Sequence, residues 1–148
     1  MSIADQINND IKQAMLAKEK EKLEALRAIK AALLLEATKG GNSEVTDDIA
    51  QQIIQKLHKQ RKESAAIYIE QNRQDLADAE LFQAKVLEAY LPEQMDEDAI
   101  RKEVMDAIAK TGASSPQDMG KVMGMLMGKL KGKADGSLIS KIVKEALN

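Results

Sequence analysis

The segment 131–137, Lys-Gly-Lys-Ala-Asp-Gly-Ser, is the best candidate in this sequence for a binding site. Its two glycines would let the backbone of another molecule come close, and its two lysines supply positive charge. Ser137 is expected to cap a helix whose first N–H groups could meet a phosphate. The alternative is an ordinary helix connection with solvated lysines. The candidate contact residues of this region are Lys121, Lys129, Lys131, Gly132, Lys133, Gly136 and Ser137.

Positive charge is concentrated in the same region. Residues 119–148 hold six lysines against Asp135 and Glu145, a local charge of +4, whereas the whole chain has a net charge of −2. The chain has two Tyr, one Phe and no Trp, which argues against stacking of bases on aromatic side chains. We therefore expect any nucleic-acid contact to be with the backbone rather than with the bases.

Glycine recurs at every fourth position from Gly120 to Gly136. This spacing resembles a packing motif of membrane helices, but lysines interrupt the apolar run. A phosphate loop needs four residues between its first glycine and the Gly-Lys pair, whereas three separate Gly128 from Gly132. A glycine inside a helix costs about 1 kcal/mol relative to alanine. Close packing between helices is the favoured explanation, and the approach of a partner's backbone is the alternative.

Groups for catalysis are scarce. One His and no Cys exclude a Cys nucleophile, a disulfide framework and a site with several His ligands. The sequence shows no plausible nucleophile–base pair and no carboxylate cluster with metal-ligand spacing. We therefore predict no catalytic residue, no metal and no cofactor. His58 is expected to be solvated beside Lys59 and Lys62.

Several polar residues fall on otherwise apolar helix faces, where long polar side chains need partners. Arg61 is predicted to pair with Glu80 in a buried contact, with Arg27 as an alternative partner for Glu80. A structural role for this layer is favoured over a catalytic one. The predicted layer consists of Arg27, Gln60, Arg61, Ser64 and Glu80.

The candidate residues are expected to lie on or between α-helices. Apolar residues recur every three or four positions and no strand signal occurs, so the predicted fold class is all-α. Four helices are expected before Pro92. They begin after Ser2, at Leu23, after Thr46 and at Asp75, and Gly40-Gly41-Asn42-Ser43 ends the second. Three more are expected to begin after Asp96, Ser115 and Ser137. In the third helix, the inward face is predicted to contain Ile49, Ile53, Leu57 and Ile67.

Pro92 marks a change in composition, because the segments beyond it are shorter and richer in Met and Gly. We predict an N-terminal helical bundle or hairpin domain over 1–92 and a three-helix domain over 93–148. No apolar run approaches the roughly 18 residues of a membrane span. The first residues lack the basic and apolar regions of a signal peptide, so a cytoplasmic location is expected.

The sequence resembles the YqeY family over essentially its full length. The resemblance rests on the order and spacing of several short motifs: Leu26-Arg27, residues 59–64, Tyr68, Arg73, residues 75–77, Glu80, residues 90–92, residues 118–123 and residues 131–136. The second half is similar to the tail domain of the B subunit of the glutamine-dependent aminoacyl-tRNA amidotransferase, the part that touches tRNA. Gly124 and Gly128 are not part of the family pattern.

The resemblance implies a tRNA-associated protein without catalytic activity of its own. It would contact the tRNA backbone through its C-terminal domain, and no contact with DNA is expected. The family-level activity, carbon–nitrogen ligase with glutamine as amido-N-donor, is then a mark of relationship, because the catalytic parts of the amidotransferase lie outside its tail domain. The alternative is an adaptor that docks on an aminoacyl-tRNA synthetase or amidotransferase without touching RNA.

Overall fold

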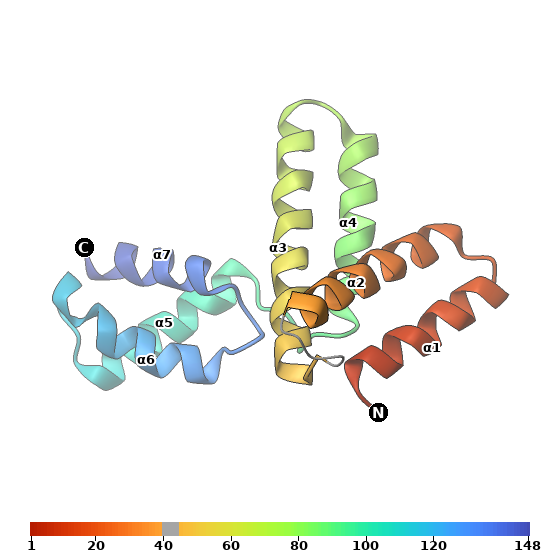
Figure 1. The fold of residues 1–148 in the computed structure, drawn as a ribbon. Helices are drawn as coiled ribbons and strands as arrows, with labels where there is room; N and C mark the ends of the chain where they lie inside the picture. Colours follow the sequence, from red (N-terminus) through yellow and green to blue (C-terminus); the bar gives the residue numbers. More distant parts are fainter. Residues whose placement is uncertain (40–44) are drawn as a thin grey trace. The chain divides into compact units, whose positions relative to one another are not determined.

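The computed structural model describes residues 1–39 and 45–148, and no strand occurs among them. The prediction of an all-α fold is confirmed (Figure 1). The chain divides into two compact units, Met1–Leu91 (unit 1) and Pro92–Asn148 (unit 2). None of the helices described is long and apolar enough to cross a membrane. The predicted end of the second helix at Gly40-Gly41-Asn42-Ser43 lies outside the described residues.

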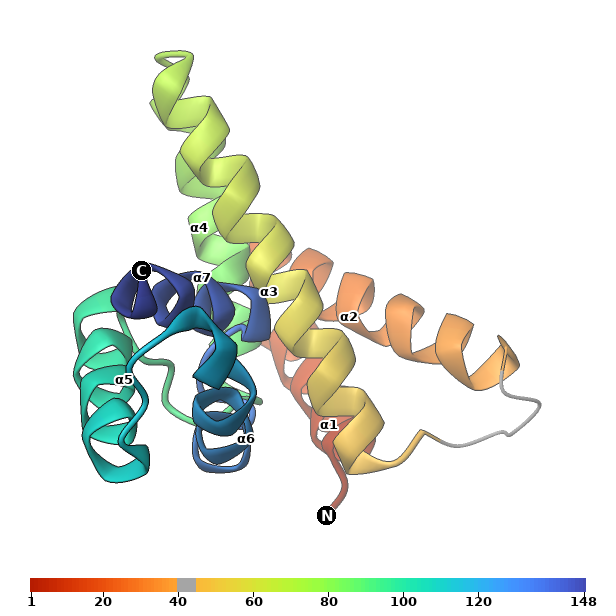
Figure 2. The same ribbon diagram turned by 90° about the vertical axis from the view of Figure 1, so that its left-hand side faces the viewer.

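Unit 1 is built from two pairs of consecutive helices: α1 (Ile3–Leu16) with α2 (Lys20–Lys39), and α3 (Asp47–Glu70) with α4 (Gln74–Glu88). The α3–α4 pair is an antiparallel hairpin whose far half extends beyond α1 and α2 (Figures 1 and 2). Its short turn contains Asn72, which has a φ of 59°. Asn is among the few residues that tolerate this left-handed conformation.

Two predicted helix caps in unit 1 are confirmed. The Ser2 hydroxyl accepts a hydrogen bond from the Asp5 N–H at 3.1 Å, and the Thr46 hydroxyl accepts one from the Ile49 N–H at 3.3 Å. Each cap satisfies an N–H group that has no partner inside its helix. The predictions were less accurate at other boundaries, because α2 begins at Lys20 rather than Leu23 and α4 begins at Gln74 rather than Asp75.

The core of unit 1 joins all four helices. Its buried members include Ile7 of α1, Leu26 of α2, Ile54 of α3 and Leu87 of α4. Tyr90, just after α4, donates a hydrogen bond to the Asp10 carboxylate of α1. Burial and this carboxylate raise the pKa of the Tyr90 hydroxyl, so it stays protonated as a donor.

The predicted inward face of α3 is right for Ile53 and Leu57, which pack against the core of unit 1, and wrong for the other two isoleucines. Ile49 and Ile67 are 40% and 52% exposed, whereas the buried positions are Ala50, Ile54, His58 and Ala65. The most buried face is turned by about 100° from the predicted one. The physical reason is that α3 lies against α4, which presents its own small residues Ala77 and Ala84. The buried face of α3 includes Ala50 and Ala65 beside Ile54, and Ile49 and Ile67 fall on a flank.

Unit 2 contains α5 (Glu97–Thr111), the short 3₁₀ turn η1 (Pro116–Asp118), α6 (Met119–Lys129) and α7 (Gly136–Leu147). Each of its three α-helices packs against the other two. The predicted cap of α5 is confirmed, because Asp96 accepts from the Ala99 N–H at 2.7 Å. Gly112 ends α5 with a φ of 70°, as a left-handed C-cap requires.

The starts of the last two helices differ from the predictions. Ser115 precedes a 3₁₀ turn rather than an α-helix, so α6 begins at Met119. The cap of α7 is Asp135 rather than Ser137. The core of unit 2 is aliphatic, and its fully buried side chains are Ile100, Val104, Val122, Leu126, Ile139, Ile142 and Val143.

Candidate RNA-contact surface

The turn between α6 and α7 is fixed by backbone hydrogen bonds. Gly132 has a φ of 76°, and the Lys133 N–H donates to the Leu130 carbonyl at 2.9 Å. The Gln94 side chain donates to the Gly132 carbonyl at 2.7 Å, and the Met95 N–H donates to the Lys133 carbonyl at 2.9 Å. The turn is therefore held against the segment before α5. Lys131 and Lys133 are exposed on it.

The N-terminus of α7 already holds a negative charge. The Asp135 carboxylate accepts from the Leu138 N–H at 3.2 Å and from the Ser137 hydroxyl. A phosphate that approached the same N–H groups would meet this carboxylate, and like charges repel. Ser137 is bonded to the cap rather than being the cap. The anion-binding role that we expected for this helix end is therefore unfavourable in this geometry.

Lys129 is paired within unit 2. Its ammonium lies 2.6 Å from an oxygen of Glu103 on α5. The hydrogen bond to Lys129 lowers the pKa of the Glu103 carboxyl, and in return Glu103 raises the pKa of Lys129. Both groups stay charged near neutral pH, and much of the field of Lys129 is cancelled. No local sequence pattern indicates this pair, because Glu103 lies 26 positions before Lys129 on another helix.

A hollow of about 400 Å³ adjoins the turn. Its polar lining mixes the two signs of charge: Lys129, Lys133, Glu93, Asp96 and Glu103. Lys129 and Lys133 are thus brought together, but among carboxylates, and a closed phosphate pocket is not formed there. Lys131 is exposed on the turn, and Lys121 is exposed near the start of α6.

The glycines of α6 face solvent. A Cβ atom built on Gly120, Gly124 or Gly128 would meet no heavy atom within 4 Å. The favoured prediction, that they allow close packing between helices, is therefore wrong for these three positions within unit 2. The core stripe of α6 lies on the opposite side, at Val122 and Leu126.

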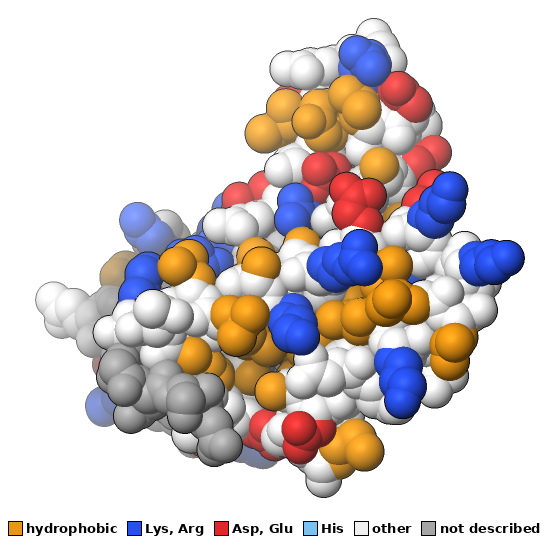
Figure 3. All heavy atoms as spheres, turned by 45° about the vertical axis from the view of Figure 1, so that its right-hand side comes forward, with side chains coloured by type: hydrophobic (Ala, Val, Ile, Leu, Met, Phe, Trp, Pro, Cys, Tyr) orange, Lys and Arg blue, Asp and Glu red, His pale blue; other side chains and the backbone are white. Residues whose placement is uncertain are grey.

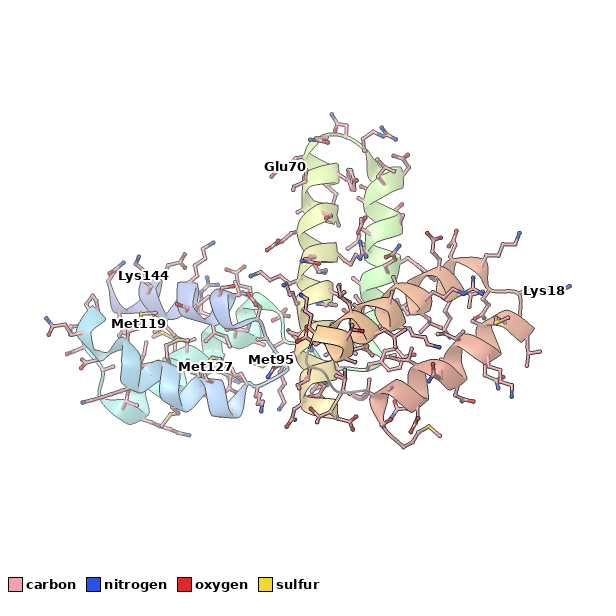
Figure 4. All side chains as sticks on the ribbon, in the orientation of Figure 1. Lys18, Glu70, Met95, Met119, Met127 and Lys144 are labelled. Carbon is pink, nitrogen blue, oxygen red and sulfur yellow. The ribbon has the colours of Figure 1, made fainter. Side chains whose placement is uncertain are left out.

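Gly136 differs from the other glycines, because its Cβ position lies 3.5 Å from the Met127 methyl group. Figure 4 shows Met127 near the end of α6 that leads into the turn. A Cβ atom at Gly136 would make an ordinary van der Waals contact with Met127. Gly136 therefore has a neighbour inside unit 2, unlike Gly120, Gly124 and Gly128, but the packing there does not require a glycine.

The predicted polar layer reduces to one pair. Arg61 Nη1 lies 3.4 Å from Glu80 Oε2, and the two side chains are 31% and 20% exposed. The pair exists, but it is half-buried rather than fully buried. Arg27 and Gln60 are exposed, because the rotation of α3 and the course of α2 place them at the surface; Ser64 is half-buried.

His58 is not solvated as predicted. Its side chain lies in the buried face of α3, and Nε2 is 3.0 Å from Glu88 Oε1 on α4. The same rotation that exposes Ile49 brings His58 inward. Within the ranges 1–39 and 45–148, no group of His, Asp or Glu is arranged to hold a metal ion.

The class of protein is defined by the match of nearly the whole sequence to a family model. The model of the YqeY-like protein family matches residues 4–147, and the chain belongs to this family. It is 34% identical to "Altered inheritance of mitochondria protein 41, mitochondrial" of Meyerozyma guilliermondii over 86 residues, which cover 57% of this chain and 44% of that protein.

Proteins with the same name in two other fungi are also similar. Identity is 28% over 120 residues in Vanderwaltozyma polyspora, covering 76% of this chain and 64% of that protein. It is 29% over 125 residues in Pyrenophora tritici-repentis, covering 81% and 68%. The chain thus spans about half to two thirds of the length of these relatives. The name assigns mitochondria to those proteins.

Proposed function

We propose that this chain is a non-catalytic docking protein that contacts the tRNA backbone through the solvent side of α6 and the turn after it. The observation that carries the proposal is the row formed by Gly120, Gly124 and Gly128. These residues forgo about 1 kcal/mol of helix propensity each, and nothing within unit 2 uses the space they leave. A backbone that approaches α6 closely would use it.

Charge supports an anionic partner at this surface. Lys121, near the start of α6, and Lys131, on the turn after it, are exposed and form no ion pair among the described residues. Lys133 is exposed on the same turn as Lys131. Phosphate contacts by lysine position an RNA without reading its sequence. The resemblance of the second half to the amidotransferase tail identifies tRNA as the expected RNA. The carbon–nitrogen ligase activity of the family label then reflects the relationship to the amidotransferase and not an activity of this chain. No cofactor is expected.

The second candidate is an adaptor that docks on an aminoacyl-tRNA synthetase or amidotransferase. Met105 of α5 and Met125 and Met127 of α6 are exposed. Exposed methionines are typical of adaptable protein-binding surfaces. Both roles are compatible with the cytoplasm, which we expected from the sequence, and with mitochondria, which the relatives' name indicates for them.

The test is tRNA binding measured across a range of salt concentrations. Each phosphate contact contributes about 0.7–0.9 to the slope of log K against log salt. We expect the double variant Lys131→Ala, Lys133→Ala to bind more weakly and to lose about 1.4–1.8 of this slope. The matched control, Lys141→Ala with Lys144→Ala, removes two exposed charges from α7 and should keep the slope of the wild type.

A second variant tests the glycine row directly. A Cβ atom at position 124 meets no heavy atom within 4 Å, so the fold should tolerate Gly124→Leu. Leucine also has a higher helix propensity than glycine. We expect tRNA affinity to fall although stability rises. Unchanged affinity in both the lysine and the glycine variants would refute the proposed surface, and absence of tRNA binding at low salt would favour the adaptor.

A further inference from the structure

A concave surface lies in unit 1, where the hairpin rises beside the start of α2. It consists of two adjoining hollows of about 550 and 450 Å³ that share Phe82 and Glu21. Phe82 is 38% exposed at this surface. Single exposed apolar residues are ordinary. An exposed aromatic ring that lines two hollows of this size is a more specific feature, because pockets that bind a partner's side chain are concave and partly apolar.

The larger hollow is negatively charged throughout. Its lining contains four carboxylates and no Lys or Arg: Glu21 and Glu24 from α2, and Asp75 and Asp78 from α4. Red side chains gather on the projecting hairpin in Figure 3. Ala79 and Gln83 complete the lining beside Phe82. These carboxylates are not arranged as a metal site, because no such group occurs among the described residues.

Two of the carboxylates have internal partners, and two do not. Asp75 pairs with Arg73 at 3.1 Å, and Asp78 accepts from the Gln74 amide at 2.7 Å. No hydrogen bond or ion pair is recorded for Glu21 or Glu24 among the described residues. Only Asp75 is paired with a cation, so the charges of Glu21, Glu24 and Asp78 are uncompensated.

The smaller hollow is lined by charges of both signs. Lys18, Lys20 and Lys22 line it together with Glu19 and Glu21. Lys22 lies 3.9 Å from Glu19, so the lining of the smaller hollow has only a small positive excess, whereas the lining of the larger hollow is negative. A bound segment would be oriented by this difference, because its cationic side chains are attracted more strongly to the larger hollow than to the smaller one.

We infer that this surface docks a basic amphipathic helix of a protein partner. An apolar side chain of that helix would rest on Phe82, and its Lys or Arg side chains would reach Glu21 and Glu24. A guanidinium or ammonium group over the ring would add a cation–π contact. An RNA backbone is disfavoured, since its phosphates would meet four carboxylates. The inference concerns unit 1 alone and is independent of the proposed RNA contact.

The experiment uses the full chain and three probes: a helical peptide of leucine and lysine, a matched peptide of leucine and glutamate, and a single-stranded RNA. We expect the lysine peptide to bind and to shift the backbone amide signals of 18–24 and 75–83. The glutamate peptide and the RNA should leave these signals unchanged. Equal binding of both peptides, or a shift of the same amides by RNA, would overturn the inference.

Variants distinguish binding at the two hollows from a general attraction between the acidic chain and a basic peptide. Glu21→Gln with Glu24→Gln should weaken peptide binding about threefold to tenfold, as expected for two exposed charge pairs. Phe82→Ala should weaken it about tenfold, because a partly buried aromatic anchor is lost. The matched control is Glu36→Gln with Glu70→Gln, two exposed carboxylates outside the hollows. An equal loss in this control, or no loss in Phe82→Ala, would refute the docking surface.

Discussion

Unit 2 and the projecting half of the α3–α4 hairpin are stabilised in different ways. In unit 2, three helices share one aliphatic core that includes Val104, Leu126 and Ile142. In the hairpin, α3 packs mainly on α4 through alanines, with the Arg61–Glu80 pair at its edge. Burial of large aliphatic groups contributes more free energy than an alanine contact or a half-exposed ion pair. We therefore expect unit 2 to depend on single core side chains and the hairpin to depend on many small contributions.

The largest expected effect is in the core of unit 2. Leu126→Ala should destabilise the protein by about 2–5 kcal/mol, because it removes a buried side chain and leaves a cavity. The matched variant on the projecting hairpin is Ile67→Ala, at a half-exposed position, and it should cost less than about 1 kcal/mol. Thermal and urea unfolding of both variants measures the difference. Equal losses of stability in the two variants would show that Ile67 is buried against another part of the protein.

The next effect concerns the Arg61–Glu80 pair. Because both side chains retain some exposure, Glu80→Gln should cost about 1–2 kcal/mol, less than the 3–5 kcal/mol of a fully buried pair. A double-mutant cycle with Arg61→Gln isolates the coupling between the two side chains. An unchanged melting temperature in Glu80→Gln would mean that the pair contributes nothing to the hairpin.

A smaller and opposite effect is expected on the solvent side of α6. Gly124→Ala should stabilise the protein by up to about 1 kcal/mol, because alanine has the higher helix propensity and its Cβ meets no neighbour. Gly112→Ala is the control, and it should destabilise the protein because that glycine has a φ of 70°. A destabilising Gly124→Ala would show that another part of the protein contacts α6.

The smallest effect is the pH dependence of the Glu103–Lys129 contact between α5 and α6. Lys129 lowers the pKa of Glu103 in the folded state. The stability from this contact is therefore present above the pKa of an unfolded glutamate, about 4.3, and is lost as pH falls through the lower folded value. Glu103→Gln should lose less stability on acidification than the wild type. Parallel acid titrations of the two proteins would contradict this expectation.

The order of the helices and several of their ends could be predicted from the sequence. Ser2, Thr46, Asp96 and Gly112 act where the sequence places them, because capping depends on a few neighbouring residues. The cap of α7 could also have been predicted, since Asp135 lies three positions before Leu138, whose N–H group it accepts from. The membership of the YqeY-like family likewise rests on sequence motifs alone.

The faces of the helices were decided by the tertiary structure. Periodicity shows which residues share a side of α3, but two neighbouring sides of this helix carry apolar residues. The close approach of α4 buries the alanine side with His58 and leaves Ile49 and Ile67 on the flank. The same holds for α6, whose glycines turn to solvent, and for Lys129, whose partner comes from another helix. Local spacing fixes the helices, whereas the contacts between helices distant in sequence decide which side chains remain available to a partner.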